Sequence, residues 1–177
     1  MSNPLYEKYN KISEYCKKLE ENNYDTYKLF SPIEVKDIEN WEKEHDMNLP
    51  EGYKNWLLLS NGFDMNIPTI LPIEKIRKCP VPKYEDFFVI GYFIGDGSMI
   101  VTDKNGNFYE LDHAFGLEKT TFEAFLETTV MNRLEDDMLE IGAIEKKTQS
   151  RYNVDAEEKL KRMLERLAEI RKNRETK

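Results

Sequence analysis

Cysteine and long apolar runs are scarce in this sequence. Cys16 and Cys79 fit neither a disulfide framework nor a metal-binding or redox spacing, so we expect both to be reduced, buried small side chains in a cytoplasmic protein. The longest uncharged aromatic and aliphatic run, Phe87–Ile94, is far too short to span a bilayer. Residues 1–11 are polar, so neither a targeting segment nor a membrane partner is predicted.

Catalytic motifs are also absent. The sequence has no GxGxxG, Walker loop, HExxH or CxxC pair, and its two histidines, His45 and His113, fall in different predicted elements. Asp112 could orient His113 as a general base, but no Ser or Cys nucleophile in a strained turn accompanies the pair. Asp96, Asp103 and Asp112 each end a predicted strand, where capping of the local backbone explains them better than Mg²⁺ or Ca²⁺ binding. We therefore predict no enzyme, no cofactor and no metal.

A surplus of basic residues is missing as well. The 177 residues carry a net charge of −8, which argues against a surface that follows nucleic-acid phosphates. The acidity is concentrated in residues 23–132, which hold nineteen acidic and ten basic side chains. This charge fits either a merely solubilising surface or a field that attracts a basic partner.

The most informative stretch is Leu49–Gly62, which contains the densest apolar cluster. Pro50 suits a first helical turn, and Asn61 and Gly62 tolerate the left-handed conformation that ends a helix. Tyr53, Trp56, Leu57 and Ser60 follow the i, i+3, i+4, i+7 spacing of one helix face. We predict a short buried helix, in which Trp56 clamps the preceding helix onto the sheet.

Other helices are predicted from caps and from periodic apolar positions. Residues 4–21 and the charged tail after Val154 both repeat apolar residues at steps of four and three, so we expect these terminal helices to pack together, within one chain or between two. Two capping boxes are predicted, and each opens an amphipathic helix. The first has Ser31 as N-cap, Pro32 at N1 and Glu34 at N3, with Val35, Ile38, Trp41 and His45 inward; the second has Thr120 as N-cap and Glu123 at N3, with Phe122, Phe125, Leu126 and Val130 inward.

A β-hairpin is predicted around Asn105-Gly106, a strong two-residue turn signal. That turn would place Thr102 opposite Tyr109 and Ile100 opposite Leu111. One face of the hairpin is then expected to carry Ile100, Thr102, Tyr109 and Leu111. The second face is expected to carry Met99, Val101, Phe108, Glu110 and Asp112. The second face mixes apolar and acidic groups, which suits either the back of the sheet or a docking surface.

Two motifs in the middle of the chain resemble a known family. Phe30-Ser31-Pro32-x-Glu34-x-x-x-Ile38-x-x-x-Glu42 and Leu49-Pro50-x-x-Tyr53-x-x-Trp56-Leu57-x-x-Ser60-Asn61-Gly62 resemble the N-terminal signature of the SUKH superfamily, in its Smi/Knr-like branch. The segments Ile90–Asp112 and Thr121–Leu126 are similar to its later strands and its final Phe-rich helix. The resemblance implies an α+β domain and, in bacteria, an immunity protein that neutralises a cognate toxin by binding it. A eukaryotic branch of the family is regulatory and tied to cell-wall signalling.

The resulting prediction is a single α+β domain with helices packed around a mixed, mostly antiparallel sheet. Its parts are an N-terminal helix in residues 1–22, a SUKH-like core in 23–132 and a helical extension in 133–177. The partner is expected to be a toxin domain, for example a basic nuclease. The alternative is a regulatory scaffold that uses the terminal helices, which could also form a homodimer. The residues predicted to bind the partner are Asp64, Asp96, Phe108, Glu110 and Asp112.

Overall fold

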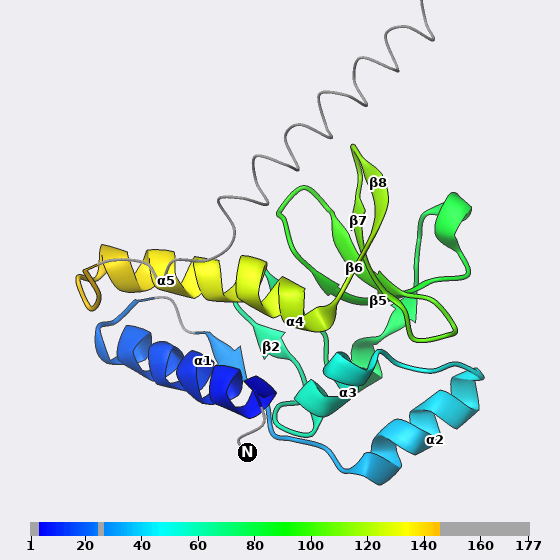
Figure 1. The fold of residues 1–177 in the computed structure, drawn as a ribbon, viewed down its shortest axis with the longest axis horizontal. Helices are drawn as coiled ribbons and strands as arrows, with labels where there is room; N and C mark the ends of the chain where they lie inside the picture. The colour runs from blue at the N-terminus through cyan, green and yellow to red at the C-terminus, as the bar shows by residue number, and fades with distance from the viewer. Residues whose placement is uncertain (1–3, 25–26, 146–177) are drawn as a thin grey trace, which may run out of the picture. The chain divides into compact units, whose positions relative to one another are not determined.

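The computed structural model describes residues 4–24 and 27–145 and shows helices packed against one antiparallel sheet (Figure 1). In these residues eight strands are ordered β1-β2-β3-β5-β6-β7-β8, and β4 pairs with β5 outside that path. The prediction of an α+β fold with a mostly antiparallel sheet and an N-terminal helix is confirmed. The strands are β1 Lys28–Leu29, β2 Phe63–Asp64, β3 Thr69–Ile70, β4 Arg77–Lys78, β5 Phe88–Tyr92, β6 Met99–Thr102, β7 Phe108–Asp112 and β8 Gly116–Thr120.

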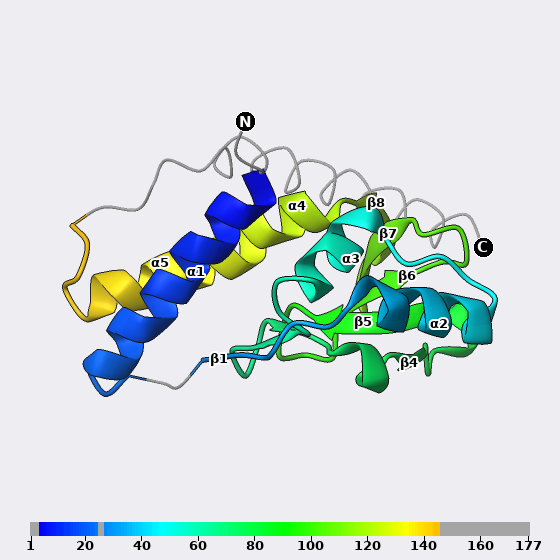
Figure 2. The ribbon, with the colours of Figure 1, turned by 90° about the horizontal axis from the view of Figure 1, so that it is seen from below.

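The first and last described helices lie side by side and run in the same direction (Figure 2). Three contacts show this direction: Lys8 pairs with Glu127, Lys11 Nζ lies 3.0 Å from Glu135 Oε1, and Tyr24 Oη lies 2.8 Å from Glu140 Oε2. The predicted tail helix after Val154 lies outside the described residues. The α-helices are α1 Pro4–Glu21, α2 Val35–His45, α3 Glu51–Leu57, α4 Phe122–Phe125 and α5 Met131–Glu140. Two short 3₁₀ turns are η1 Ile73–Lys75 and η2 Pro82–Tyr84. A π-helical turn, η3 Leu126–Val130, joins α4 to α5.

The Leu49–Gly62 segment forms the predicted buried helix. Tyr53, Trp56, Leu57 and Ser60 are all fully buried, and Gly62 has a φ of +98°. Aromatic rings surround Trp56 at centroid distances of 5.8 to 6.2 Å, and they belong to Tyr9 of α1, Phe63 of β2 and Phe122 of α4. Trp56 therefore joins α1 and α4 to the sheet, and Ile38 of α2 belongs to the same buried cluster.

The two sheet faces bury clusters of different size. The helix-covered face contributes Ile90, Ile100 and Phe108 to the large core that contains Trp56. The opposite face has a smaller cluster around Val89 and Val101. Partly buried aromatic residues from the segment between β4 and β5, and from β5 and β7, pack against this smaller cluster; they are Tyr84, Phe87, Tyr92 and Tyr109.

The N-cap of helix α2 lies three residues after the predicted N-cap. Residues 31–33 stay extended, because Ile33 N–H donates to Leu57 O at 3.2 Å and Ser31 O accepts from Asn61 N–H at 3.3 Å. Glu34 is the actual N-cap, and it forms a capping box with Asp37. The prediction of Val35 as an inward residue is wrong, since its side chain is 55% exposed.

The β6–β7 register differs by one residue from the prediction. Thr102 pairs with Phe108 and Ile100 with Glu110, so the predicted partners Tyr109 and Leu111 are wrong. Asp103 causes the difference, because its Oδ1 accepts the N–H groups of two later residues, Asn105 at 2.9 Å and Asn107 at 3.0 Å, and so closes a wider turn. A one-residue slip moves every side chain of one strand to the other face. Phe108 and Glu110 therefore share the helix-covered face with Ile100 and Thr102.

The N-cap of the last helical segment lies one residue after the predicted N-cap. Thr120 is the final residue of β8 and pairs with Phe108, so it is not the N-cap. The cap is Thr121, whose Oγ1 accepts Ala124 N–H at 3.1 Å. The inward set predicted for this helix is confirmed, because Phe122, Phe125, Leu126 and Val130 are all buried.

Candidate partner-binding site

Three turns lie at the same end of the sheet. Antiparallel pairing of β3 with β5 puts the β2–β3 turn, residues 65–68, beside the β5–β6 turn, residues 93–98. The pairing of β6 with β7 and of β7 with β8 brings residues 113–115 to the same end, whereas the β6–β7 turn lies at the opposite end. We refer to residues 64–68, 93–98 and 112–115 as the three-turn end.

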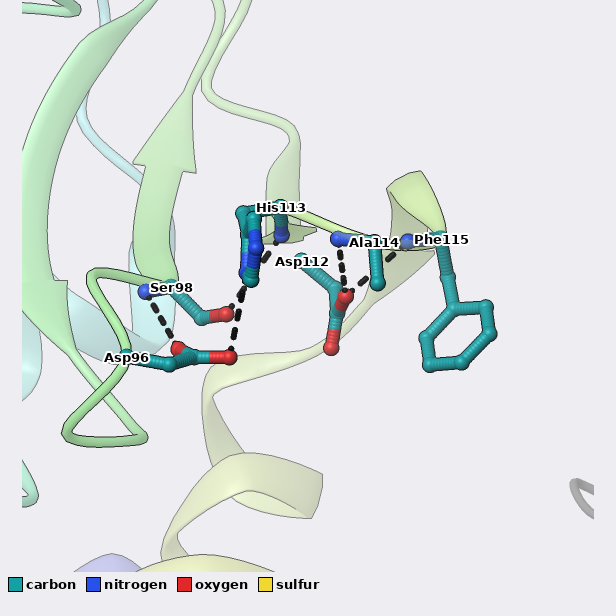
Figure 3. Close-up of polar contacts among 6 residues, drawn as sticks. All are labelled: Asp96, Ser98, Asp112, His113, Ala114 and Phe115. Carbon is teal, nitrogen blue, oxygen red and sulfur yellow. Dashed lines mark hydrogen bonds and ion pairs between the residues drawn. The ribbon is translucent and has the colours of Figure 1, made fainter.

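An aspartate fixes the backbone of each of these turns. Asp64 Oδ1 accepts Asn66 N–H at 2.9 Å, and Asp96 Oδ1 accepts Ser98 N–H at 2.9 Å. Asp112 Oδ1 accepts the N–H groups of the next turn residues, Ala114 at 2.8 Å and Phe115 at 2.9 Å (Figure 3). This is the backbone capping expected of Asp at strand ends, and it holds short turns in one conformation.

His113 links two of the turns. Its Nδ1 lies 3.2 Å from Asp96 Oδ2, and its backbone N–H points to Ser98 Oγ at 3.5 Å (Figure 3). Hydrogen bonds from Ser98, together with His113, hold the pKa of Asp96 below its usual range. Asp96 therefore stays a carboxylate at neutral pH and keeps the β5–β6 turn beside the β7–β8 turn.

Large hydrophobic side chains are exposed on all three turns. Of the five that are exposed in the described part of the chain, three belong to the three-turn end: Ile67 at 39%, Ile94 at 46% and Phe115 at 42%. Ile67 lies against the β5–β6 turn, since a Cβ placed on Gly95 would be 3.7 Å from its Cδ1. Exposed apolar side chains next to carboxylates are typical of a surface that binds a protein.

The structure brings together three of the five residues predicted to bind a partner. Asp64 and Asp96 are exposed and Asp112 is half-buried, and all three belong to the three-turn end. Phe108 and Glu110 lie elsewhere. Phe108 is 4% exposed and packs against Phe122 and Phe125, and Glu110 is 9% exposed. The register difference accounts for this, because it turns both residues toward the helices.

The histidine contact does not form a catalytic triad. Among the described residues, the Ser98 hydroxyl contacts the backbone N–H of His113 rather than its imidazole, and Ser98 is fully buried. A nucleophile must reach both its base and the substrate, and this serine reaches neither. In the same part of the chain, no three His, Cys, Asp or Glu side chains are grouped so that they could hold a metal ion.

The contacts of the two cysteines and of His45 are those of residues with a structural role. Cys79 is buried, and burial raises the pKa of Cys16 to about 12, far above the range of a reactive thiol. His45 stacks on Trp41 with ring centroids 4.1 Å apart, and its Nδ1 lies 2.9 Å from Trp41 O. None of these groups adds to the three-turn end. No helix in residues 4–24 or 27–145 is long and apolar enough to cross a bilayer.

Sequence reasoning did not identify the exposed hydrophobic residues of this site. Ile67, Ile94 and Phe115 each stand next to a turn residue, and Phe115 directly precedes Gly116, whose φ is +85°. The signal that could have identified them is an apolar residue directly beside a turn residue at a strand end, because turns lie on the protein surface.

The fold is that of an α+β domain with three turns exposed at one end of its sheet. The model of the SMI1 / KNR4 family (SUKH-1) matches residues 32–143, well over half of the chain. The chain belongs to this family, which includes immunity proteins and whose members generally bind protein partners without catalysis. Neither the comparison with curated proteins nor the comparison with solved structures gave a significant match.

Proposed function

We propose that this protein is an immunity protein that neutralises a cognate bacterial toxin in the cytoplasm by binding it at the three-turn end. The observation that carries the proposal is the gathering of Ile67, Ile94 and Phe115 beside Asp64 and Asp96. Membership of the SMI1 / KNR4 family supports a protein as the partner.

Charge favours a basic partner. Three carboxylates, Asp64, Asp96 and Asp112, stand at the three-turn end of a chain whose net charge is −8. Complementary charge speeds association and fixes orientation, while buried apolar anchors supply most of the affinity. Nucleases carry basic surfaces because they bind phosphates, so a nuclease toxin domain is the specific partner that we propose.

Co-expression tests the proposal. The toxin-like product of a neighbouring gene is expressed in a bacterial host with and without this protein, and growth is measured. We expect the protein to restore growth and to co-purify with the toxin domain. Toxicity that persists at equal expression, with no complex on size-exclusion chromatography, would refute toxin neutralisation.

Matched lysine substitutions test the surface. Ile94→Lys and Phe115→Lys place a cation where we expect an apolar anchor, and each should weaken toxin binding at least about tenfold, as expected of a hot-spot residue. Val35→Lys is the control, since Val35 is also exposed but lies on α2, outside the three-turn end. Equal affinities for all three variants would place the toxin on another surface.

A further inference from the structure

A groove of about 590 Å³ adjoins the three-turn end. The β2–β3 turn forms one wall, and residues from the end of β5 and from α5 form the others. The lining residues are Asp64, Met65, Asn66, Ile67, Thr69, Leu71, Tyr92 and Arg133.

The groove offers apolar contact surface and an aromatic ring. Met65 and Leu71 are only 2% and 9% exposed, and Ile67 belongs both to this groove and to the three-turn end. Tyr92 holds its hydroxyl toward Arg77, which donates to it. Such a lining suits an unbranched aliphatic chain, and a carboxylate at its mouth suits a cation at the end of that chain.

The charges at the groove differ in how far they are already paired. Arg133 is held by Asp137, with Nε 3.3 Å from Oδ2, and Asp137 is buried. Within the described residues, the Asp64 carboxylate has no ion pair, and its one hydrogen bond uses Oδ1 to accept Asn66 N–H. Asp64 is therefore the charge that remains open to an incoming group, and a cationic donor forms the strongest hydrogen bond with a carboxylate.

We propose that this groove receives a lysine or arginine side chain of the partner, with its aliphatic stem against Ile67 and Leu71 and its charged end at Asp64. The inference rests on the proposed function, because it names the group through which a basic toxin would engage this surface. Residues 64–67 belong both to the groove and to the three-turn end, so one partner surface covers both.

The test uses peptide probes, so it does not depend on identifying the toxin. Acetyl-Ala-Arg-Ala-amide is titrated into the full-length protein, and amide shifts are followed by ¹H–¹⁵N NMR. The controls are the same peptide with citrulline, which has the shape of arginine without its charge, and the same peptide with glutamate. We expect shifts at Asn66, Ile67 and Thr69, and binding about two- to fivefold weaker for citrulline, the ratio of one exposed ion pair.

Two variants identify the anchoring carboxylate. Asp64→Asn should abolish the difference between arginine and citrulline, while Glu39→Gln, which removes an equal charge on the exposed face of α2, should preserve it. Ile67→Ala should weaken the arginine and citrulline peptides equally, because it removes contact with the stem.

Several results would overturn the inference. These are equal affinity for arginine, citrulline and glutamate, shifts confined to other residues, or tighter binding of the glutamate peptide, which would make Arg133 the anchor. Toxin rescue without groove binding would defeat this inference alone, whereas groove binding without rescue would leave the basic-residue site in place and defeat the toxin assignment.

Discussion

The aromatic core and the three-turn end are built from the same strands but held together in different ways. Trp56 is fully buried among rings from α1, β2 and α4, which are distant in sequence. At the three-turn end, each aspartate binds N–H groups only two or three residues further on. The core thus depends on long-range apolar packing, and the turns depend on local hydrogen bonds.

This difference separates stability from recognition. Substitutions in the core must change the packing of several elements at once, because protein interiors are densely packed. Exposed turn side chains can change while the aspartates keep the backbone in place. A binding domain organised in this way can take new partners on one rigid fold, and the following predictions test that separation.

The largest effect is expected from Trp56→Ala. Removing a fully buried indole leaves a cavity among Tyr9, Phe63 and Phe122, so the free energy of unfolding should fall by about 3 to 5 kcal/mol. Urea denaturation followed by circular dichroism measures it. Trp41→Ala is the control, because Trp41 is only partly buried and should cost clearly less. A loss below about 1 kcal/mol for Trp56→Ala would contradict the role of this residue as the centre of the core.

The next largest effect concerns Asp137, a buried carboxylate on α5. It accepts the Tyr27 hydroxyl at 2.6 Å and the Tyr24 hydroxyl at 3.2 Å, and so ties the segment after α1 to α5. Burial, together with this carboxylate, raises the pKa of Tyr27 to about 12.

Asp137→Ala should therefore lower the free energy of unfolding by about 2 to 3 kcal/mol, because it leaves a buried hydroxyl and Arg133 without their acceptor. Tyr27→Phe removes only one hydrogen bond and should cost about 1 kcal/mol. Chemical denaturation of both variants gives the comparison, and equal losses would mean that the other contacts of Asp137 contribute nothing.

Much of the core could be predicted because periodicity and caps report on burial. Tyr53, Trp56 and Leu57 were predicted from helical spacing, and each is fully buried. Of the two predicted terminal helices, only the helix at residues 4–21 lies in the described part of the chain, so the predicted packing of the two stays a prediction. The start of α2 could not be predicted, because the strand-like contacts of Ser31 and Ile33 come from residues near the end of α3. Tertiary hydrogen bonds outweighed a local cap signal there.

The candidate site was predicted only in part, for a related reason. Asp96 and Asp112 were predicted at strand ends, where Asp is favoured whatever the tertiary fold, and Asp64 was proposed because residues 23–132 are acidic. Phe108 and Glu110 were assigned to the surface through a hairpin register that assumed a two-residue turn. The side chain of Asp103 instead closes a wider turn, and the sequence pattern gives no sign of that choice.

Asp103 should contribute a smaller, pH-dependent share of stability. Partial burial would raise its pKa, but hydrogen bonds from Asn107, Asn105 and Tyr109 outweigh this and lower it. A carboxyl group with a lowered pKa in the folded state stabilises the protein above its unfolded pKa, and this contribution is lost as the pH falls through the folded pKa.

Asp103→Ala should therefore cost about 1 kcal/mol at pH 7, as expected of hydrogen bonds in a solvent-screened turn, and much less near pH 3. Thermal unfolding of the variant and the parent at both pH values measures the difference. A penalty that does not change with pH would show that the neutral acid serves the turn as well as the carboxylate.

The smallest effect on stability is expected at Ile94, for which the chain offers a close control. Ile94 is 46% exposed in the β5–β6 turn, whereas Ile90, four residues earlier on β5, is 1% exposed. Ile94→Ser should change the free energy of unfolding by no more than about 0.5 kcal/mol, and Ile90→Ser should lower it by about 3 kcal/mol or more, because it puts a hydroxyl and a cavity into the core. Binding of the toxin domain, measured by calorimetry, should weaken for the folded Ile94→Ser variant. Unchanged binding with unchanged stability would remove Ile94 from the partner surface, and a large loss of stability would show that the turn belongs to the core after all.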